Sequence, residues 1–246
     1  MRRRLAVLGC SFSEYQTANG EPWSIHIAKN FDIEVHNYAV GGRGCLFADL
    51  VLKYIVSQSM TVMEFKYDAC IVQMPPPGRW MLPIDTSPFL DFSEMIVPKK
   101  IDNYWVMFSD ESRTRDNCVN LMPKFDYNKI TINGEKVRYD PTGYPDAYSL
   151  YFEDTLHLYN DYFKNNLWHF HVGKQVVNPH RNNLGHEKSM LSTLHLNSGM
   201  SLHDWQMKYT FKKQGDSGHL NELGNKEAYE QYILPSPIGD WLNGTS

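Results

Sequence analysis

The sequence predicts an α/β fold in which a parallel sheet carries helices on both faces. Three short apolar runs, bounded by glycine or proline, alternate with two segments of helical periodicity in the first third of the chain. This strand–helix–strand–helix–strand order implies right-handed crossovers between parallel strands. A chain of 246 residues suits one such domain, so we expect a single domain over 1–246.

The first strand is expected over 4–9, where the apolar run of RLAVLGC ends in glycine. The segment PWSIHIAKNF then has helical spacing, because Trp23, Ile27 and Phe31 fall on one face. Pro22 suits the first turn of that helix. A second strand is expected over 33–39 and runs into GGRG, where the backbone has to turn sharply.

The next helix is LFADLVLKYIVSQ, and its spacing predicts an inward face of Leu46, Leu50, Tyr54 and Ile55. A third strand is expected over 69–74, closed by the sequence PPPG. These two elements complete the first half of the expected sheet.

Residues 79–148 are rich in proline, aspartate and asparagine and show little periodicity, which predicts an insertion that forms a lid or a partner surface. Within it, Asn133-Gly134 between two alternating runs predicts a β-hairpin. Beyond it we expect an amphipathic helix (DAYSLYFEDTLHLYNDYFKNN), a strand (LWHFHV), and a last helix followed by a tail broken by prolines.

Composition excludes several classes of protein. The net charge of −4 gives no electrostatic basis for binding nucleic acid, and Arg2, Arg3 and Arg4 fit a solvated lead-in to the first strand. No run approaches the roughly 18 apolar residues of a membrane span, and LAVLGC is too short for the core of a signal peptide. The four cysteines form no CxxC pair. We therefore expect a soluble protein of a reducing compartment, cytoplasmic in the producing cell.

Ser11 follows directly on the first strand, in LGCSFS. Functional groups in parallel sheets gather beyond the carboxyl ends of strands, so Ser11 is a candidate nucleophile. A serine that caps a helix is the simpler alternative for this position.

Asp216 and His219 stand three residues apart in QGDSGHLNELG, just before a predicted helix. A serine nucleophile needs a base to take its proton, and the base needs an acid to fix its tautomer. The pair can supply both, although a polar helix cap has the same pattern. A glycine N–H in HNYAVGGRG, after the second strand, can join that of Ser11 as an oxyanion hole, and a plain glycine turn is the alternative.

Taken together, GCSFS, NYAVGG and DSGHLNELG resemble blocks I, II and V of the SGNH (GDSL-like) hydrolase superfamily, in the same order. The resemblance implies a three-layer α/β/α sandwich with a flavodoxin-like sheet, and serine hydrolysis of esters without metal or cofactor. It assigns the nucleophile to Ser11, the base to His219 and the orienting acid to Asp216. It assigns a second oxyanion N–H to Gly42, five residues after Asn37.

Two positions depart from that pattern. Cys10 replaces the aspartate of block I, as in a GCSF-type branch of the superfamily. Pro77 stands about where block III has an asparagine that donates to the oxyanion, and proline has no donor. Arg79 or Gln73 can substitute, and Arg79 is preferred because a guanidinium offers several donors and a positive charge. A structural loop arginine is the alternative for Arg79.

The remaining candidates are possible metal ligands and a possible substrate contact, and their sequence patterns are weaker. His169 and His171 would share a strand face as metal ligands can, but no third ligand is apparent, so we expect no metal. Trp80 is a weak candidate for contact with substrate, and core packing is the more frequent role of a tryptophan.

We therefore expect a serine ester hydrolase that acts on a small-molecule or glycan ester, with sugar O-acetyl groups as the first substrate class. The alternative is a catalytically weak or inactive subunit of the same fold, with a glycan-binding, virion or other structural role. The GCSF type resembles chains of phage genomes and bacterial carbohydrate loci, so association with a virion and assembly into a homo-oligomer are both left open.

Overall fold

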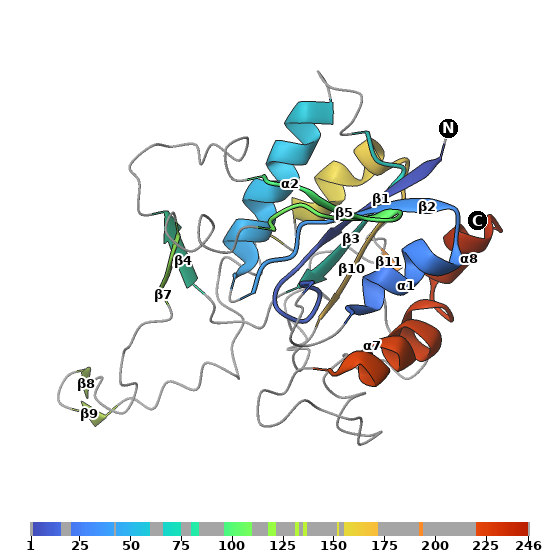
Figure 1. Cartoon of the computed structure of the whole chain (residues 1–246). Helices are drawn as coiled ribbons and strands as arrows, with labels where there is room; N and C mark the ends of the chain where they lie inside the picture. The colour runs from blue at the N-terminus through green and yellow to red at the C-terminus, as the bar shows by residue number, and fades with distance from the viewer. Residues whose placement is uncertain are drawn as a thin grey trace.

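The structure of the protein is a computed structural model. It describes residues 2–15, 21–41, 43–59, 66–74, 80–83, 96–109, 118–121, 131–132, 135–136, 152, 155–171, 192–193 and 220–245. Their centre is a seven-stranded sheet in which every neighbouring pair is parallel except the last, β6 with β5 (Figure 1). In spatial order its strands are β11 (Ser192–Thr193), β10 (Leu167–His171), β3 (Ala69–Met74), β1 (Arg3–Leu8), β2 (Ile33–Asn37), β6 (Tyr104–Val106) and β5 (Lys99–Ile101).

The central strand β1 pairs in parallel with β2 on one side and β3 on the other. The strands expected over 4–9, 33–39 and 69–74 are therefore confirmed as parallel neighbours. The strand expected from LWHFHV is confirmed as β10, which pairs in parallel with β3. The apolar runs of β1 and β3 are buried because these strands are covered on both faces of the sheet.

Helices lie on both faces of the sheet, and alternate residues of β1 separate the two cores (Figure 1). Leu5 and Val7 face the core formed with α1 (Trp23–Asn30), α7 (Glu222–Ala228), the π-helix η6 (Tyr229–Ile233) and α8 (Pro237–Asn243). Ala6 and Leu8 face the core formed with α2 (Cys45–Ser59) and the 3-10 helix η3 (Leu156–Phe163).

Part of the expected insertion belongs to the main sheet. Within 79–148, β6 pairs in parallel with β2, and β5 pairs with β6 as an antiparallel edge strand. The rest of the described insertion forms two small antiparallel pairs outside the main sheet: β4 (Trp80–Pro83) with β7 (Cys118–Leu121), and β8 (Thr131–Ile132) with β9 (Glu135–Lys136). The second pair flanks Asn133-Gly134, as a hairpin requires.

The chain's last described residues form a helix where the prolines predict a broken tail. Ser236 caps α8, with its Oγ accepting from the N–H of Ile238 at 3.2 Å, and Pro237 occupies the first helical position. Proline is favoured there because that position needs no N–H donor. Among the described residues, no helix is long and apolar enough to cross a bilayer.

Candidate active site

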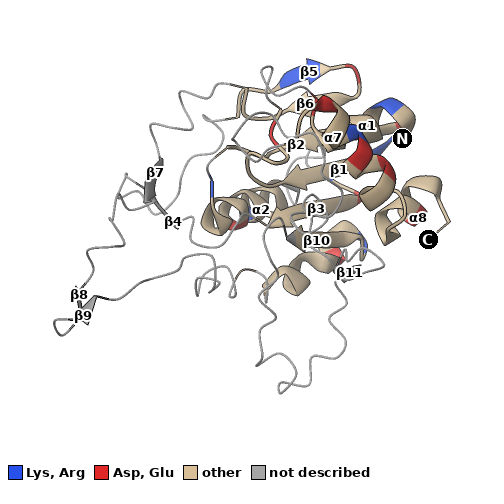
Figure 2. Ribbon diagram, turned by 90° about the horizontal axis from the view of Figure 1, so that it is seen from below, with Lys and Arg blue, Asp and Glu red and all other residues tan. Residues whose placement is uncertain are grey.

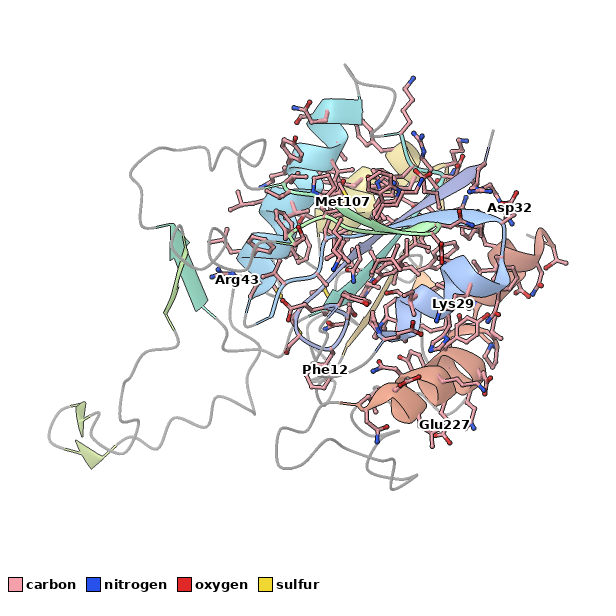
Figure 3. The ribbon with its side chains drawn as sticks, in the orientation of Figure 1. Phe12, Lys29, Asp32, Arg43, Met107 and Glu227 are labelled. Atoms are coloured by element: carbon pink, nitrogen blue, oxygen red, sulfur yellow. The ribbon has the colours of Figure 1, made fainter. Side chains whose placement is uncertain are left out.

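The chain makes a tight turn immediately after β1, and Ser11 lies in it. The carbonyl of Cys10 accepts from the N–H groups of Ser13 at 2.9 Å and Glu14 at 3.0 Å. Ser11 is half-buried, whereas Ser13 is fully buried. Phe12, labelled in Figure 3, marks this turn at the carboxyl end of the sheet.

The turn lies where the chain reverses its direction of winding. From β1 the chain passes through α1 to β2 on one side, and β3 lies on the other side of β1. The connecting helices α1 and α2 pack on opposite faces, so the topological switch point of the sheet falls at the carboxyl ends of β1 and β3. Ser11 is thus at the place where α/β sheets collect their ligands.

The peptide geometry fixes where the N–H of Ser11 points. That N–H shares a peptide group with the Cys10 carbonyl, and no described peptide bond is cis. In a trans peptide the N–H and C=O are antiparallel. Because the carbonyl points into the turn toward Ser13 and Glu14, the Ser11 N–H points out of it.

The loop after β2 is tied to this turn by Asn37, which is buried. Its Nδ2 donates to the carbonyl of Ser13 at 2.6 Å, and its Oδ1 accepts from the N–H of Ala39 at 2.9 Å. Farther along, the N–H of Val40 donates to the carbonyl of Gly9 at 3.3 Å. The GCSFS and NYAVGG segments therefore lie side by side.

Gly41 lies close to Glu14, at the end of the turn after β1. A Cβ placed on Gly41 would lie 2.5 Å from Oε2 of Glu14, so the absence of a side chain lets this carboxylate lie against the backbone. Gly42, the expected oxyanion donor, is the next residue and lies outside the described residues.

The C-terminal segment reaches the same region through Trp23, the first residue of α1. The backbone N–H of Trp23 donates to Oδ1 of Asn225 in α7 at 3.2 Å, and its indole Nε1 donates to Oγ of Ser13 at 2.9 Å. Asn225 in turn donates from Nδ2 to the carbonyl of Leu220 at 3.3 Å. A continuous hydrogen-bonded chain thus links the residue after His219 to the Ser11 turn.

Leu220 and Asn221 fix how the chain enters α7. Leu220 is buried in the core that α1 and α7 share, and Asn221 caps α7 by accepting from the N–H of Gly224 at 2.9 Å. Asp216 and His219 precede these residues and lie outside the described part of the chain, so their distance from Ser11 stays a prediction.

Gln73 has a different place from the one considered for it as an oxyanion donor. It is fully buried, with Oε1 accepting from the N–H of Cys10 at 3.0 Å and Nε2 donating to the carbonyl of Met74 at 2.7 Å. Both ends of its amide are therefore bonded to backbone groups, and the side chain stabilises the Ser11 turn through Cys10. Arg79 lies outside the described residues, as does the side chain of Trp80, whose backbone begins β4.

From the sequence, His169 and His171 are candidate metal ligands. Among the described residues, no group of three or more His, Cys, Asp and Glu side chains is placed to hold an ion. His169 is buried in β10, and the side chain of His171 is outside the described part. Cys10, Cys45 and Cys70 are buried free thiols.

Sequence reasoning missed the roles of Ser13, Trp23 and Asn225. The sequence does indicate that these residues need partners, because polar atoms in buried segments must be hydrogen-bonded. In the structure, Trp23 donates to Ser13 and to Asn225. Which partner each one finds depends on contacts between distant segments, which periodicity does not encode.

The described residues thus define an α/β protein with a serine turn at the switch point of its parallel sheet. No protein-family model matches the sequence, and no curated protein is significantly similar to it. Function is therefore inferred from the residues of this chain and their geometry.

Proposed function

We propose that the protein is an SGNH-like serine esterase with a three-layer α/β/α sandwich and a flavodoxin-like sheet. The sheet order supports the fold, because β2-β1-β3-β10-β11 follows the doubly wound order 2-1-3-4-5 when its parallel strands are numbered along the chain without β6. The turn at the carboxyl end of β1 supports the site, since ligands of such sheets bind there.

One observation carries the proposal: Trp23 bridges the Ser11 turn and α7. Its two hydrogen bonds, to Ser13 and to Asn225, join segments about two hundred residues apart in sequence. The only chemistry-bearing motif directly before α7 is Asp216-x-x-His219. A nucleophile and its base have to meet in this way, whereas an unrelated pair of loops does not.

In the proposed mechanism, Ser11 Oγ attacks the ester carbonyl while His219 accepts its proton and Asp216 steadies the imidazolium. The N–H groups of Ser11 and Gly42, assisted by Arg79, bind the oxyanion. His219 then protonates the departing alcohol, and water activated by the same residue releases the carboxylic acid from Ser11. No cofactor or metal takes part in these steps.

The substrate class that we propose is an O-acetyl or related ester of a carbohydrate, on the analogy of fold and motif. Residues 79–148, apart from β5 and β6, would form a lid or a partner surface over the site. A cytoplasmic enzyme and a virion-associated one are both compatible with this proposal.

The test is labelling by a fluorophosphonate, which phosphonylates an activated serine. Wild type should be labelled at Ser11, and Ser11→Ala should lose the label. Ser57→Ala is the matched control, because Ser57 is an exposed serine at the end of α2 bonded to the carbonyl of Tyr54. No label on wild-type Ser11, and no turnover of aryl acetates, would overturn the esterase and favour the binding or structural subunit.

A further inference from the structure

Gln73 is an amide buried in the middle of the molecule, at the carboxyl end of an otherwise apolar strand. All six residues of β3 are buried, and Gln73 is 0% exposed. A buried amide is costly unless both its ends are hydrogen-bonded. The partners of Gln73 therefore show what the amide is for.

Those partners belong mainly to the turn that holds Ser11. Oε1 of Gln73 accepts from the N–H of Cys10 at 3.0 Å and contacts Cys10 Sγ at 3.3 Å and Ser13 Oγ at 3.4 Å. Trp23 donates to Ser13 Oγ, so the Ser13 hydroxyl proton is directed to Gln73. Nε2 donates to the carbonyl of Met74 at 2.7 Å.

This arrangement immobilises both peptide groups that flank Cys10. Gln73 holds the N–H of Cys10 from one side, while Ser13 and Glu14 hold its carbonyl from the other. Because the Ser11 N–H belongs to the second of these peptide groups, its direction is set by the same bonds. Gly9 leaves room for this packing, since a Cβ there would lie 2.8 Å from Gln73 Oε1.

We propose that Gln73 is a positioning residue that fixes the direction of the Ser11 N–H, the donor that the proposed mechanism assigns to the oxyanion. The inference rests on the proposed esterase function. A donor fixed before the reaction stabilises the transition-state charge without reorganising, so loosening it lowers kcat more than it raises KM. Gln73 acts through Cys10 and does not itself contact substrate.

Gln73→Glu gives a test with a signature in pH. A protonated carboxyl copies the amide, with a carbonyl oxygen for Cys10 and a hydroxyl donor for Met74, whereas the ionised form has no donor. Burial favours the protonated form. The ratio of kcat in Gln73→Glu to kcat in wild type should be near one at pH 5 and fall about tenfold to a hundredfold by pH 8, with KM little changed. Gln73→Met should be impaired by a similar factor at every pH.

Asn160→Asp is the matched control, because it makes the same amide-to-acid change at a buried site. Asn160 is 3% exposed, and its Oδ1 accepts from the N–H of Leu167 at 3.2 Å, at the amino end of β10 and so at the opposite edge of the sheet. Asn160→Asp should lower Tm and leave the kcat ratio flat from pH 5 to pH 8.

Three outcomes distinguish the positioning role of Gln73 from the esterase function on which it rests. A kcat ratio for Gln73→Glu that is independent of pH, or one matched by Asn160→Asp, overturns the role of Gln73 and leaves the esterase standing. Unchanged amide hydrogen exchange at Cys10 in Gln73→Met also overturns it, without reference to turnover. Absence of both turnover and Ser11 labelling in wild type overturns the esterase and the role of Gln73 together.

Discussion

Gly9 lies between the end of β1 and the Ser11 turn, where it faces two side chains. A Cβ on Gly9 would lie 2.8 Å from Oε1 and 3.1 Å from Cβ of Gln73, and 3.3 Å from Cβ of Ser13. Both neighbours are fully buried and hydrogen-bonded, so neither can move freely. Gly9→Ala should therefore reduce the free energy of unfolding by about 1–3 kcal/mol, measured by denaturant titration.

Gly41→Ala is the control for this prediction. The atom that its Cβ would meet at 2.5 Å is Oε2 of Glu14, the end of a half-buried flexible side chain. That carboxylate can swing aside, so Gly41→Ala should cost less than Gly9→Ala. If Gly41→Ala lowers the free energy of unfolding as much as Gly9→Ala or more, the side chains around Gly9 can move to accommodate a Cβ.

Arg79 carries the prediction that depends most on the missing block III asparagine. The stiff sequence PPPGRW allows a guanidinium two residues after Pro77 to be held in one place. Arg79→Ala should lower kcat on an aryl acetate about tenfold to a thousandfold with little change in KM, as expected for a lost oxyanion contact. Arg79→Lys should recover part of that loss.

The control for Arg79 is Arg2→Ala, which removes an exposed arginine that pairs with Asp32 at 2.6 Å. It should leave kcat and KM unchanged. Wild-type kinetics in both Arg79 variants would mean that Arg79 has no part in the reaction.

Among the secondary-structure elements, the strands were the most predictable and the faces of α2 the least. Apolar runs identify β1 and β3 because buried parallel strands have no polar side, whereas β2 and β10 mix apolar residues with polar ones. The inward face expected for α2 was wrong in part: Ile55 is buried, but Leu46, Leu50 and Tyr54 are only partly buried. The helix is apolar on nearly every side, so periodicity does not select one face.

The strand β6 escaped prediction because it has only three residues, too few to show a period. Its neighbour β5 closes the sheet with Lys99 and Lys100, seen as the blue strand in Figure 2. Exposed lysines on an edge strand discourage pairing with another chain. The pairing of β6 with β2 follows from tertiary contacts, mainly those of Tyr104.

Tyr104 connects β6 to the candidate site, and this gives a test at the level of the element. Its hydroxyl is fully buried, bonded to Ser24 Oγ at 2.9 Å and to Asn37 Nδ2 at 2.6 Å. Tyr104→Phe would remove the partner of the buried Ser24 hydroxyl and of one Nδ2 hydrogen of Asn37, while the other Nδ2 hydrogen still bonds to the carbonyl of Ser13. We expect the free energy of unfolding to fall by about 1–3 kcal/mol.

Tyr229→Phe is the matched control for Tyr104→Phe. The Tyr229 hydroxyl accepts from Nδ2 of Asn30 at 3.1 Å, and Asn30 is exposed and can bond to water instead. The loss should therefore be smaller, at most about 1 kcal/mol by thermal or denaturant unfolding. A loss in Tyr104→Phe no larger than this would contradict the linking role of Tyr104.

On the scale of the whole molecule, the sequence predicted that the central strands are parallel neighbours and that Ser11 lies at their carboxyl edge. It did not predict what holds that edge together. Asn37, Gln73 and Trp23 join five separate segments there, namely the turn after β1, α1, β2, β3 and α7, and each bond depends on three-dimensional approach. Local patterns specify elements, whereas this network is specified only once the elements are packed.

Two histidines whose pKa is lowered by burial, His36 and the half-buried His26, contribute to the expected response of the fold to acid. Burial lowers the pKa of His36, and the Glu34 carboxylate 2.8 Å from its Nε2 offsets this only in part. Burial also lowers the pKa of His26, on α1. The unfolded chain therefore binds protons at these positions more readily than the folded one. Stability should be full above pH 6.5, the ordinary histidine value, and fall as pH decreases below it.

His26→Phe isolates one half of this response. The His26 ring lies 5.6 Å from that of Tyr229 in η6, and its buried Nε2 has no hydrogen-bond partner among the described residues. Phenylalanine keeps the ring contact and removes both the orphaned nitrogen and the proton uptake.

The charges near His26 oppose one another, since Glu21 and Glu230 raise the histidine pKa while Lys29 and Lys226 lower it. Burial is therefore the cause to remove, and the variant should be at least as stable as wild type at pH 8. Denaturant titrations between pH 5 and pH 8 should show a shallower loss of stability on acidification, with the contribution of His36 retained. A slope equal to that of wild type would show that the α1–η6 contact does not take part in acid unfolding.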